Sequence, residues 1–240
     1  MDDAQVQEYL DAARKEDLLM FLDIQMGHST VEAEVPHVLP FLRDPRVHLA
    51  LDPEFATPPD QEPGDVIGGM DAAEINKAQE ALQKLVDEYR LPNKILVVHQ
   101  FWSEMIRNKE ALQQFPNVDL VIDMDGFGPA SDKIAGYERF VKEDGAAHGG
   151  MKLFYEQDTG LMPPEQVDGL EPQPDVVIYS SEPALTSTSP HFRYFSVILN
   201  EVKDLYCRLE RRRKCQDSGS TSPRCRSGQI RSSPEAAPRF

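Results

Sequence analysis

Pairs of carboxylate side chains stand where apolar runs of this sequence end. VHLALDPEF ends in Asp52 and Glu54, and VDLVIDMDG ends in Asp123 and Asp125. Residues i and i+2 of a strand point to the same side, so each pair is expected to project in one direction. Like charges in one poorly solvated pocket raise each other's proton affinity, which can produce a general acid beside a base. We therefore take these four residues as candidate catalytic residues.

Other polar and aromatic side chains follow similar apolar runs and are candidates for substrate binding. They are Asp23 and Gln25 in LLMFLDIQ, His99, Gln100 and Trp102 in KILVVHQFW, and Lys152 and Tyr155 in MKLFY. The carboxyl ends of parallel strands form the active site of α/β sheets and barrels, so these residues are expected to converge although they lie far apart in the chain. Lys152 could equally have a structural role, neutralising the acids through an ion pair.

Hydrolysis of a glycoside is one reaction that such residues can perform. It uses two carboxyl groups, one that protonates the leaving oxygen and one that acts as nucleophile or base. Asp52 or Glu54 could face Asp123 or Asp125 in this way. Aromatic side chains at the strand ends, such as Trp102, could provide a stacking face for a sugar ring. The sequence thus favours glycoside-hydrolase-like action on, or binding of, a cell-envelope carbohydrate.

Two other interpretations remain open. The acids could simply accept hydrogen bonds from loop amides in a non-catalytic binding or structural barrel. Alternatively, the protein could be a metal-dependent hydrolase. The carboxylates and one imidazole that could bind a divalent cation are those of Asp23, Asp52, Glu54, His99 and Asp123. No HxH, HExxH or CxxC spacing supports a metal site, and neither a nucleotide-binding glycine loop nor a GxSxG elbow is present. The sequence therefore predicts no metal and no other cofactor.

The elements that must position these residues alternate regularly along the chain. Apolar runs predict strands at 18–24, 47–51, 94–98, 118–122, 151–155 and 176–179, and helical periodicity or caps predict helices at 5–15, 29–42, 71–89, 103–115, 131–142 and 163–170. Continuous apolar strands separated by helices indicate a parallel sheet with both faces covered. Six such units predict an α/β fold of the TIM type, an incomplete (β/α)8 barrel that lacks about two strands.

Composition divides the chain into two parts. Residues 1–184 are expected to form the partial barrel domain, and residues 185–240, rich in Ser, Pro and Arg, are expected to form a basic, disordered tail. The net charge of −16 and an acidic body argue against a nucleic-acid partner. No apolar window is long enough for a membrane span. All cysteines, Cys207, Cys215 and Cys225, lie in the tail, so no disulfide framework is expected in the body, and the oligomeric state is left open.

Seven ordered motifs between residues 6 and 179 resemble an uncharacterised bacterial family of TIM-barrel-like proteins. The motifs are FLDIQMGHS, HLALDPEF, VIGGMDAAEIN, ILVVHQF, VIDMDGFG, MKLFYEQDTGLM and PDVVIY. The resemblance implies two further N-terminal strands and, as in many members, an upstream export or lipoprotein signal and an extracytoplasmic location. This chain opens in an amphipathic helix without a signal peptide. We therefore expect an N-terminally truncated barrel, which as written would be cytoplasmic.

Overall fold

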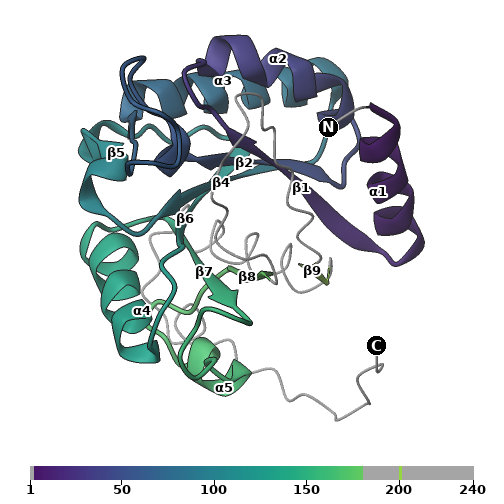
Figure 1. Cartoon of the computed structure of the whole chain (residues 1–240). Coiled ribbons are helices and arrows are strands. Elements are labelled where there is room, and N and C mark those ends of the chain that lie inside the picture. Colours follow the sequence, from purple (N-terminus) through teal and green to yellow (C-terminus); the bar gives the residue numbers. More distant parts are fainter. Residues whose placement is uncertain (1–2, 181–199, 202–240) are drawn as a thin grey trace.

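The computed structural model describes residues 3–180 and 200–201, and its centre is one curved sheet (Figure 1). Six strands of this sheet are parallel: β1 (Leu18–Gln25), β2 (Val47–Asp52), β4 (Lys94–Gln100), β6 (Val118–Met124), β7 (His148–Phe154) and β8 (Val176–Ser180). Their order across the sheet is β8-β7-β6-β4-β2-β1, and β9 (Asn200–Glu201) pairs antiparallel with β1 at the edge. The prediction of an incomplete α/β barrel with six parallel strands is confirmed.

Helices cover the outer, convex side of this arc, as α2, α3 and α4 show in Figure 1. The α-helices are α1 (Asp3–Lys15), α2 (Val31–Leu42), α3 (Ala72–Tyr89), α4 (Ala130–Tyr137) and α5 (Pro164–Asp168). Shorter elements are the 3-10 turns η1 (Pro53–Phe55), η2 (Ser103–Met105) and η3 (Lys109–Ala111), the π-helical η4 (Glu138–Glu143), and strands β3 (Met70–Asp71) and β5 (Ile106–Arg107). The strand–helix alternation of the sequence thus places each helix against the outside of the sheet.

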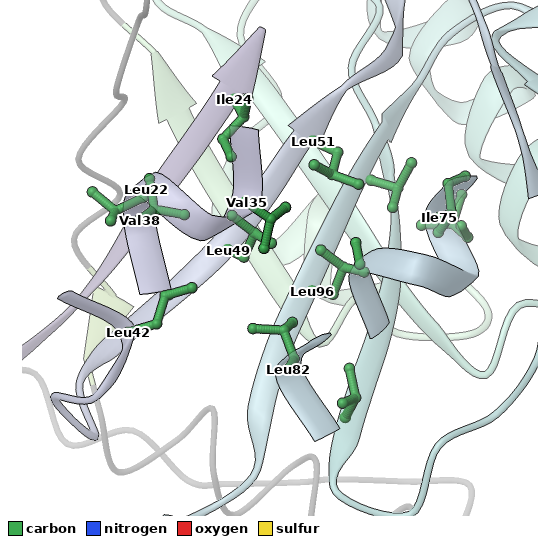
Figure 2. Packing of buried hydrophobic residues seen from close by; sticks show 14 of the residues in the cluster. Leu22, Ile24, Val35, Val38, Leu42, Leu49, Leu51, Ile75, Leu82 and Leu96 are labelled. Carbon is green, nitrogen blue, oxygen red and sulfur yellow. The ribbon is translucent and has the colours of Figure 1, made fainter. Parts of the chain in front are cut away.

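The main hydrophobic core fills the space between the sheet and the helices. Figure 2 shows Leu22, Ile24, Leu49, Leu51 and Leu96 from the strands packed against Val35, Val38 and Leu42 of α2 and Ile75 and Leu82 of α3. A second buried cluster alternates with these strand residues: Leu19, Phe21, Ala50, Ile95, Val97, Val121, Val176 and Ile178. Successive strand residues point to opposite faces, so the second cluster lies on the concave face. Both faces are buried, which explains the continuous apolar runs.

Two helices begin directly after a residue whose side chain caps the first turn, as the sequence predicts. Thr30 precedes α2, and its hydroxyl accepts a hydrogen bond from the amide of Ala33 at 3.3 Å. Asp71 precedes α3, and its carboxylate accepts one from the amide of Ala73 at 2.9 Å. Each cap satisfies an amide that lacks a partner within the first turn of its helix.

The helix predicted for residues 103–115 is wrong. The segment forms η2, β5 and η3 instead, and Asn108 between them has the left-handed φ of 53° that ends any helix. β5 pairs in parallel with β3, and the side chain of Asn76 on α3 bonds the backbone of Ala111 and Gln113 at 2.9 Å each. These contacts come from residues distant in sequence, so tertiary pairing overrides the local helical pattern.

The predicted disordered tail lies outside the described residues, apart from β9. The predicted domain boundary at residue 184 also lies outside them, and the last described parallel strand ends at Ser180. Among residues 3–180 and 200–201, no helix combines the length and the apolar character that a membrane crossing requires.

Candidate functional site

Three strands bring their polar ends together around the imidazole of His99. Its Nε2 lies 3.3 Å from Oδ2 of Asp23, and its Nδ1 lies 2.9 Å from Oδ2 of Asp123 and 3.6 Å from Oδ2 of Asp125. His99 belongs to β4, Asp23 to β1 and Asp123 to β6, and Asp125 directly follows the end of β6. We use the name carboxylate cluster for the five acids at this edge of the sheet: Asp23, Asp52, Glu54, Asp123 and Asp125.

Strand register explains why these side chains meet. His99 is the direct neighbour of Asp123 in the parallel pairing of β4 with β6, so both side chains point to the concave face. Asp123 is in turn the neighbour of Gly150 on β7. A Cβ atom at Gly150 would overlap Oδ1 of Asp123, so the absence of a side chain at position 150 makes room for this carboxyl group.

Lys152 provides the nearest ammonium group to the cluster. Its Nζ lies 3.0 Å from Oδ1 of Asp125 and 5.2 Å from the ring centroid of Phe154. Burial alone would lower the pKa of Lys152, but the negative charges of Asp125, Asp52 and Asp23 raise it above its usual value. Lys152 is therefore positively charged, and it forms the ion pair that the sequence left as its structural role.

Most side chains of the carboxylate cluster are buried, and several of their oxygens form no hydrogen bond with the described residues. The side chains of Asp23, Asp52, Asp123 and Asp125 are buried, and Asp123 has no exposed surface at all. Oδ1 of Asp23, of Asp52 and of Asp123 has no hydrogen-bond partner among the described residues. Burial, followed by the charge of Asp23, raises the pKa of Asp52 well above its usual value. Buried ionised groups without partners are costly, so this edge favours added protons or a cation.

Glu54 is the member of the cluster that reaches solvent. It lies in η1, directly after β2, and is half-buried. Burial and the negative charge of Asp125 raise the pKa of Glu54 to about 7. The backbone amide of Gly68 donates to the carbonyl of Glu54 at 2.6 Å, which ties the long loop after η1 back onto this turn. Near neutral pH, Glu54 therefore exchanges a proton readily.

His99 and Asp123 influence each other's protonation. Burial alone would lower the pKa of His99, but the carboxylates of Asp125, Asp23 and Asp123 raise it well above its usual value. Burial also raises the pKa of Asp123, against the opposing effect of His99. Without a further ligand, the imidazole is thus held in its charged form between carboxylates on both of its nitrogens.

Exposed aromatic side chains lie at the carboxyl ends of four strands, of which β6 also leads to members of the carboxylate cluster. Trp102 after β4, Phe127 after β6, Tyr155 after β7 and Tyr179 in β8 each expose between 44 and 58% of their surface. We call these four residues the aromatic rim. The rings of Tyr155 and Tyr179 stack, with centroids 5.6 Å apart and planes 24° from parallel. Tyr179 alternates with Ile178 of the concave cluster, so this stacked pair lies towards the outer face of the sheet. The ring of Phe127 instead contacts the ring of Phe154, which lies beside the ammonium group of Lys152.

The predicted residues Gln25 and Gln100 point to opposite faces of the sheet, and only Gln25 shares the face of the acids. Gln25 is half-buried at the end of β1, in register with Asp52. Gln100 follows His99 and so points to the other side of the sheet. Its Oε1 accepts from Lys109 at 2.7 Å, and its Nε2 donates to the carbonyl of Trp102 at 3.3 Å. Gln100 therefore supports the turn that presents Trp102, outside the cluster.

Two surface cavities in the described part of the chain are lined by other residues. One, of about 530 Å³, lies by the start of α2 and includes Ser29 and Asp71. The other, of about 660 Å³, is lined by Gln100, Lys109 and Asp144 among others. No member of the carboxylate cluster lines either of them.

No protein-family model matches this sequence, and comparison with curated proteins and with solved structures found no match. The resemblance to a bacterial TIM-barrel-like family stays a prediction from the seven motifs. The site is accordingly interpreted from its own geometry.

Sequence reasoning missed two residues of this edge. Gly150 creates the space for Asp123, and only the register of β6 with β7 places these two residues together. Phe127 belongs to the aromatic rim, and its position directly after the acids of VIDMDGF was a usable signal. With these additions, the edge combines a proton-exchanging carboxyl group, a buried group of charges and exposed aromatic side chains.

Proposed function

We propose that this protein binds carbohydrate at the carboxyl edge of its sheet and hydrolyses glycosidic bonds there. The observation that carries the proposal is that the carboxylate cluster and exposed aromatic side chains both lie at the carboxyl ends of the parallel strands, with Phe127 shortly after Asp123 and Asp125. Sugar rings stack on exposed aromatic faces, and glycoside hydrolysis requires two carboxyl groups with different roles. Both requirements are supplied within a few residues of the strand ends.

Glu54 is the proton donor in this proposal. A general acid needs a pKa near the working pH, and burial together with Asp125 raises the pKa of Glu54 to about 7. Its half-buried position leaves it accessible to a leaving oxygen. The acids of β6, Asp123 and Asp125, supply the opposite role and orient the attacking water. Lys152 pairs with Asp125 and so keeps a positive charge beside Asp123 and Asp125, whereas Glu54 carries the proton.

The binding experiment uses the native fluorescence of Trp102. The chain contains a single tryptophan, so its emission reports the aromatic rim alone. The full chain is titrated with soluble fragments of bacterial cell-wall glycan and with neutral and acidic oligosaccharides. We expect quenching or a blue shift with one of these classes. Phe127→Ala is expected to weaken that binding about fivefold or more, since loss of an aromatic stacking partner costs roughly 1–3 kcal/mol. Tyr9→Ala, which removes an exposed tyrosine of α1, is the matched control and leaves it unchanged.

Hydrolysis is measured on the glycan that binds, by the release of reducing ends. Glu54→Gln is expected to retain binding and lose turnover, because the amide cannot donate the proton that the leaving oxygen needs. Binding without turnover in the wild-type chain would instead favour a non-catalytic carbohydrate-binding barrel. No response of Trp102 to any glycan of the panel would contradict the proposal altogether.

A further inference from the structure

We propose that His99, Asp123 and Asp125 bind a divalent cation, and that Asp23 orients His99 for this role. The three ligand residues each offer one atom, and these atoms all lie within 4.8 Å of one another. All three residues are buried. Among the described residues, no other group of His, Cys, Asp and Glu side chains meets this geometry.

One nitrogen of His99 faces both candidate carboxylates. Nδ1 lies 2.9 Å from Oδ2 of Asp123 and 3.6 Å from Oδ2 of Asp125. An ion placed between these three atoms would need only small side-chain shifts to reach ordinary coordination distances of about 2.0–2.2 Å.

The other nitrogen of His99 faces Asp23. Oδ2 of Asp23 lies 3.3 Å from Nε2, which forms no hydrogen bond among the described residues, and a small rotation of the ring would align an N–H with this oxygen. Histidine ligands of metals usually donate their second ring N–H to a carboxylate, which fixes the tautomer and the ring orientation. Asp23 thus occupies the place of the outer partner, and His99 directs its Nδ1 lone pair towards the two acids of β6.

An unsatisfied buried atom provides an independent observation. Oδ1 of Asp123 is fully buried, has no hydrogen-bond partner among the described residues, and lies over the empty side-chain position of Gly150. Among the described residues, Lys152 and His99 form the ion pairs with the acids of the cluster. A buried excess of carboxylates with unpaired oxygens is stabilised by a cation, because Coulomb attraction is strong where water is excluded.

The donor set indicates the class of ion. Two carboxylates and one imidazole suit borderline divalent ions such as Mn²⁺, Fe²⁺ and Zn²⁺, whereas Ca²⁺ and Mg²⁺ prefer oxygen ligands only. A bound ion of this class lowers the pKa of a coordinated water and so supplies a nucleophile at neutral pH. This catalytic role rests on the proposed function, in which Asp123 and Asp125 orient the attacking water. Binding of the ion rests on the geometry alone.

The test uses the full chain, treated with EDTA and then dialysed, with Mn²⁺ as the probe. Electron paramagnetic resonance measures free Mn²⁺ during a titration. We expect one bound ion per chain. Asp23→Asn is expected to weaken binding by about 10- to 100-fold, as is typical for loss of an outer carboxylate partner. Asp123→Asn and Asp125→Asn, which remove ligands, are expected to weaken it more.

The chain offers a matched control at the opposite ends of the strands. His148 also lies between two acids, with Nδ1 3.1 Å from Asp175 and Nε2 4.0 Å from Asp119. His148→Gln is expected to leave Mn²⁺ binding unchanged. A second measurement on the wild-type chain avoids any effect of a variant on folding: substoichiometric Mn²⁺ should broaden the imidazole resonances of His99 in labelled protein before those of His148.

Each outcome decides the inference. Absence of Mn²⁺ binding by the wild-type chain would overturn it, as would binding that broadens His148 first or survives both Asp123→Asn and Asp125→Asn. If the chain binds no Mn²⁺ and its glycan binding and turnover persist in EDTA, the proposed cation site would be overturned and the proposed function would stand. Mn²⁺ binding at His99 without any glycan response would overturn the proposed function and leave the cation site.

Discussion

His99 and Asp123 are direct neighbours across two parallel strands, and their side chains meet at 2.9 Å on the concave face of the sheet. This contact organises the edge of the sheet, because the same imidazole also faces Asp23 and Asp125. Removing either partner would leave buried charge without compensation.

The first prediction concerns His99 itself. His99→Leu deletes the imidazole that lies between Asp23 and Asp123, so we expect the free energy of unfolding to fall by about 3–5 kcal/mol in the absence of added metal. Urea denaturation followed by circular dichroism measures the change. His37→Leu, at an exposed position of α2, is the control and should change the free energy of unfolding by less than about 0.5 kcal/mol. Equal stability of the two variants would show that the charges of the cluster are compensated without His99.

The second prediction concerns the space beside Asp123. Gly150→Ala places a methyl group where Oδ1 of Asp123 lies, so we expect a loss of about 1–3 kcal/mol and weaker Mn²⁺ binding together. Gly169→Ala adds a methyl group at a residue with φ of −80° and no such overlap, and should cost less than about 1 kcal/mol. A Gly150→Ala protein with wild-type stability and Mn²⁺ affinity would mean that the carboxyl group of Asp123 can lie elsewhere.

The third prediction is the pH dependence caused by Glu54. Burial and the charge of Asp125 raise its pKa from 4.5 to about 7 in the folded chain, so the folded state binds the proton more tightly than the unfolded state. The contribution of Glu54 to stability is therefore present below pH 4.5 and is lost as the pH rises through 7, by at most about 3 kcal/mol. Glu54→Gln should be more stable than wild type at pH 8, and hydrolysis by the wild-type chain should decline above pH 7 as Glu54 loses its proton.

The control for that experiment is Glu62→Gln, which changes an exposed glutamate of the loop after η1. Its stability relative to wild type should not vary between pH 4.5 and pH 8. A difference between Glu54→Gln and wild type that is the same at both pH values would rule out a raised pKa of Glu54.

The fourth prediction concerns a buried lysine at the other end of β4. Lys94 has no exposed surface, and its Nζ donates to the carbonyls of Asp44 and Val47 at 2.8 Å each. Burial lowers its pKa from 10.5 to about 8, so the folded chain releases this proton before the unfolded chain does. The contribution of Lys94 to stability is therefore present above pH 10.5 and is lost as the pH falls through 8, by about 3 kcal/mol.

Urea denaturation at pH 7.5 and pH 10 tests this prediction. The free energy of unfolding of wild type, relative to Lys94→Met, should increase between the two pH values. Lys84→Met removes an exposed lysine of α3 and should show a much smaller change over the same range. An unchanged difference for Lys94→Met would indicate that the ammonium group keeps its ordinary pKa in the fold.

The sequence by itself determined the strands, most helices and the edge of the sheet at which the acids gather. Apolar runs of five to eight residues can be buried on both faces only in a covered parallel sheet, and acids at their ends must then lie at one edge. The helix predicted at 103–115 does not form, because β5 in this segment pairs with the distant strand β3. Helical periodicity within one segment carries no signal for a partner strand.

Only the tertiary structure decided which residues of that edge act together. The register of β4 with β6 and β7 places His99 beside Asp123 and Asp123 over Gly150, whereas Gln100, one residue further along, turns to the other side. The raised pKa of Glu54 likewise arises from burial and from Asp125, a residue of another strand. Register, burial and charge between distant segments are collective properties of the packed chain, so the spacing of residues along the sequence could not specify them.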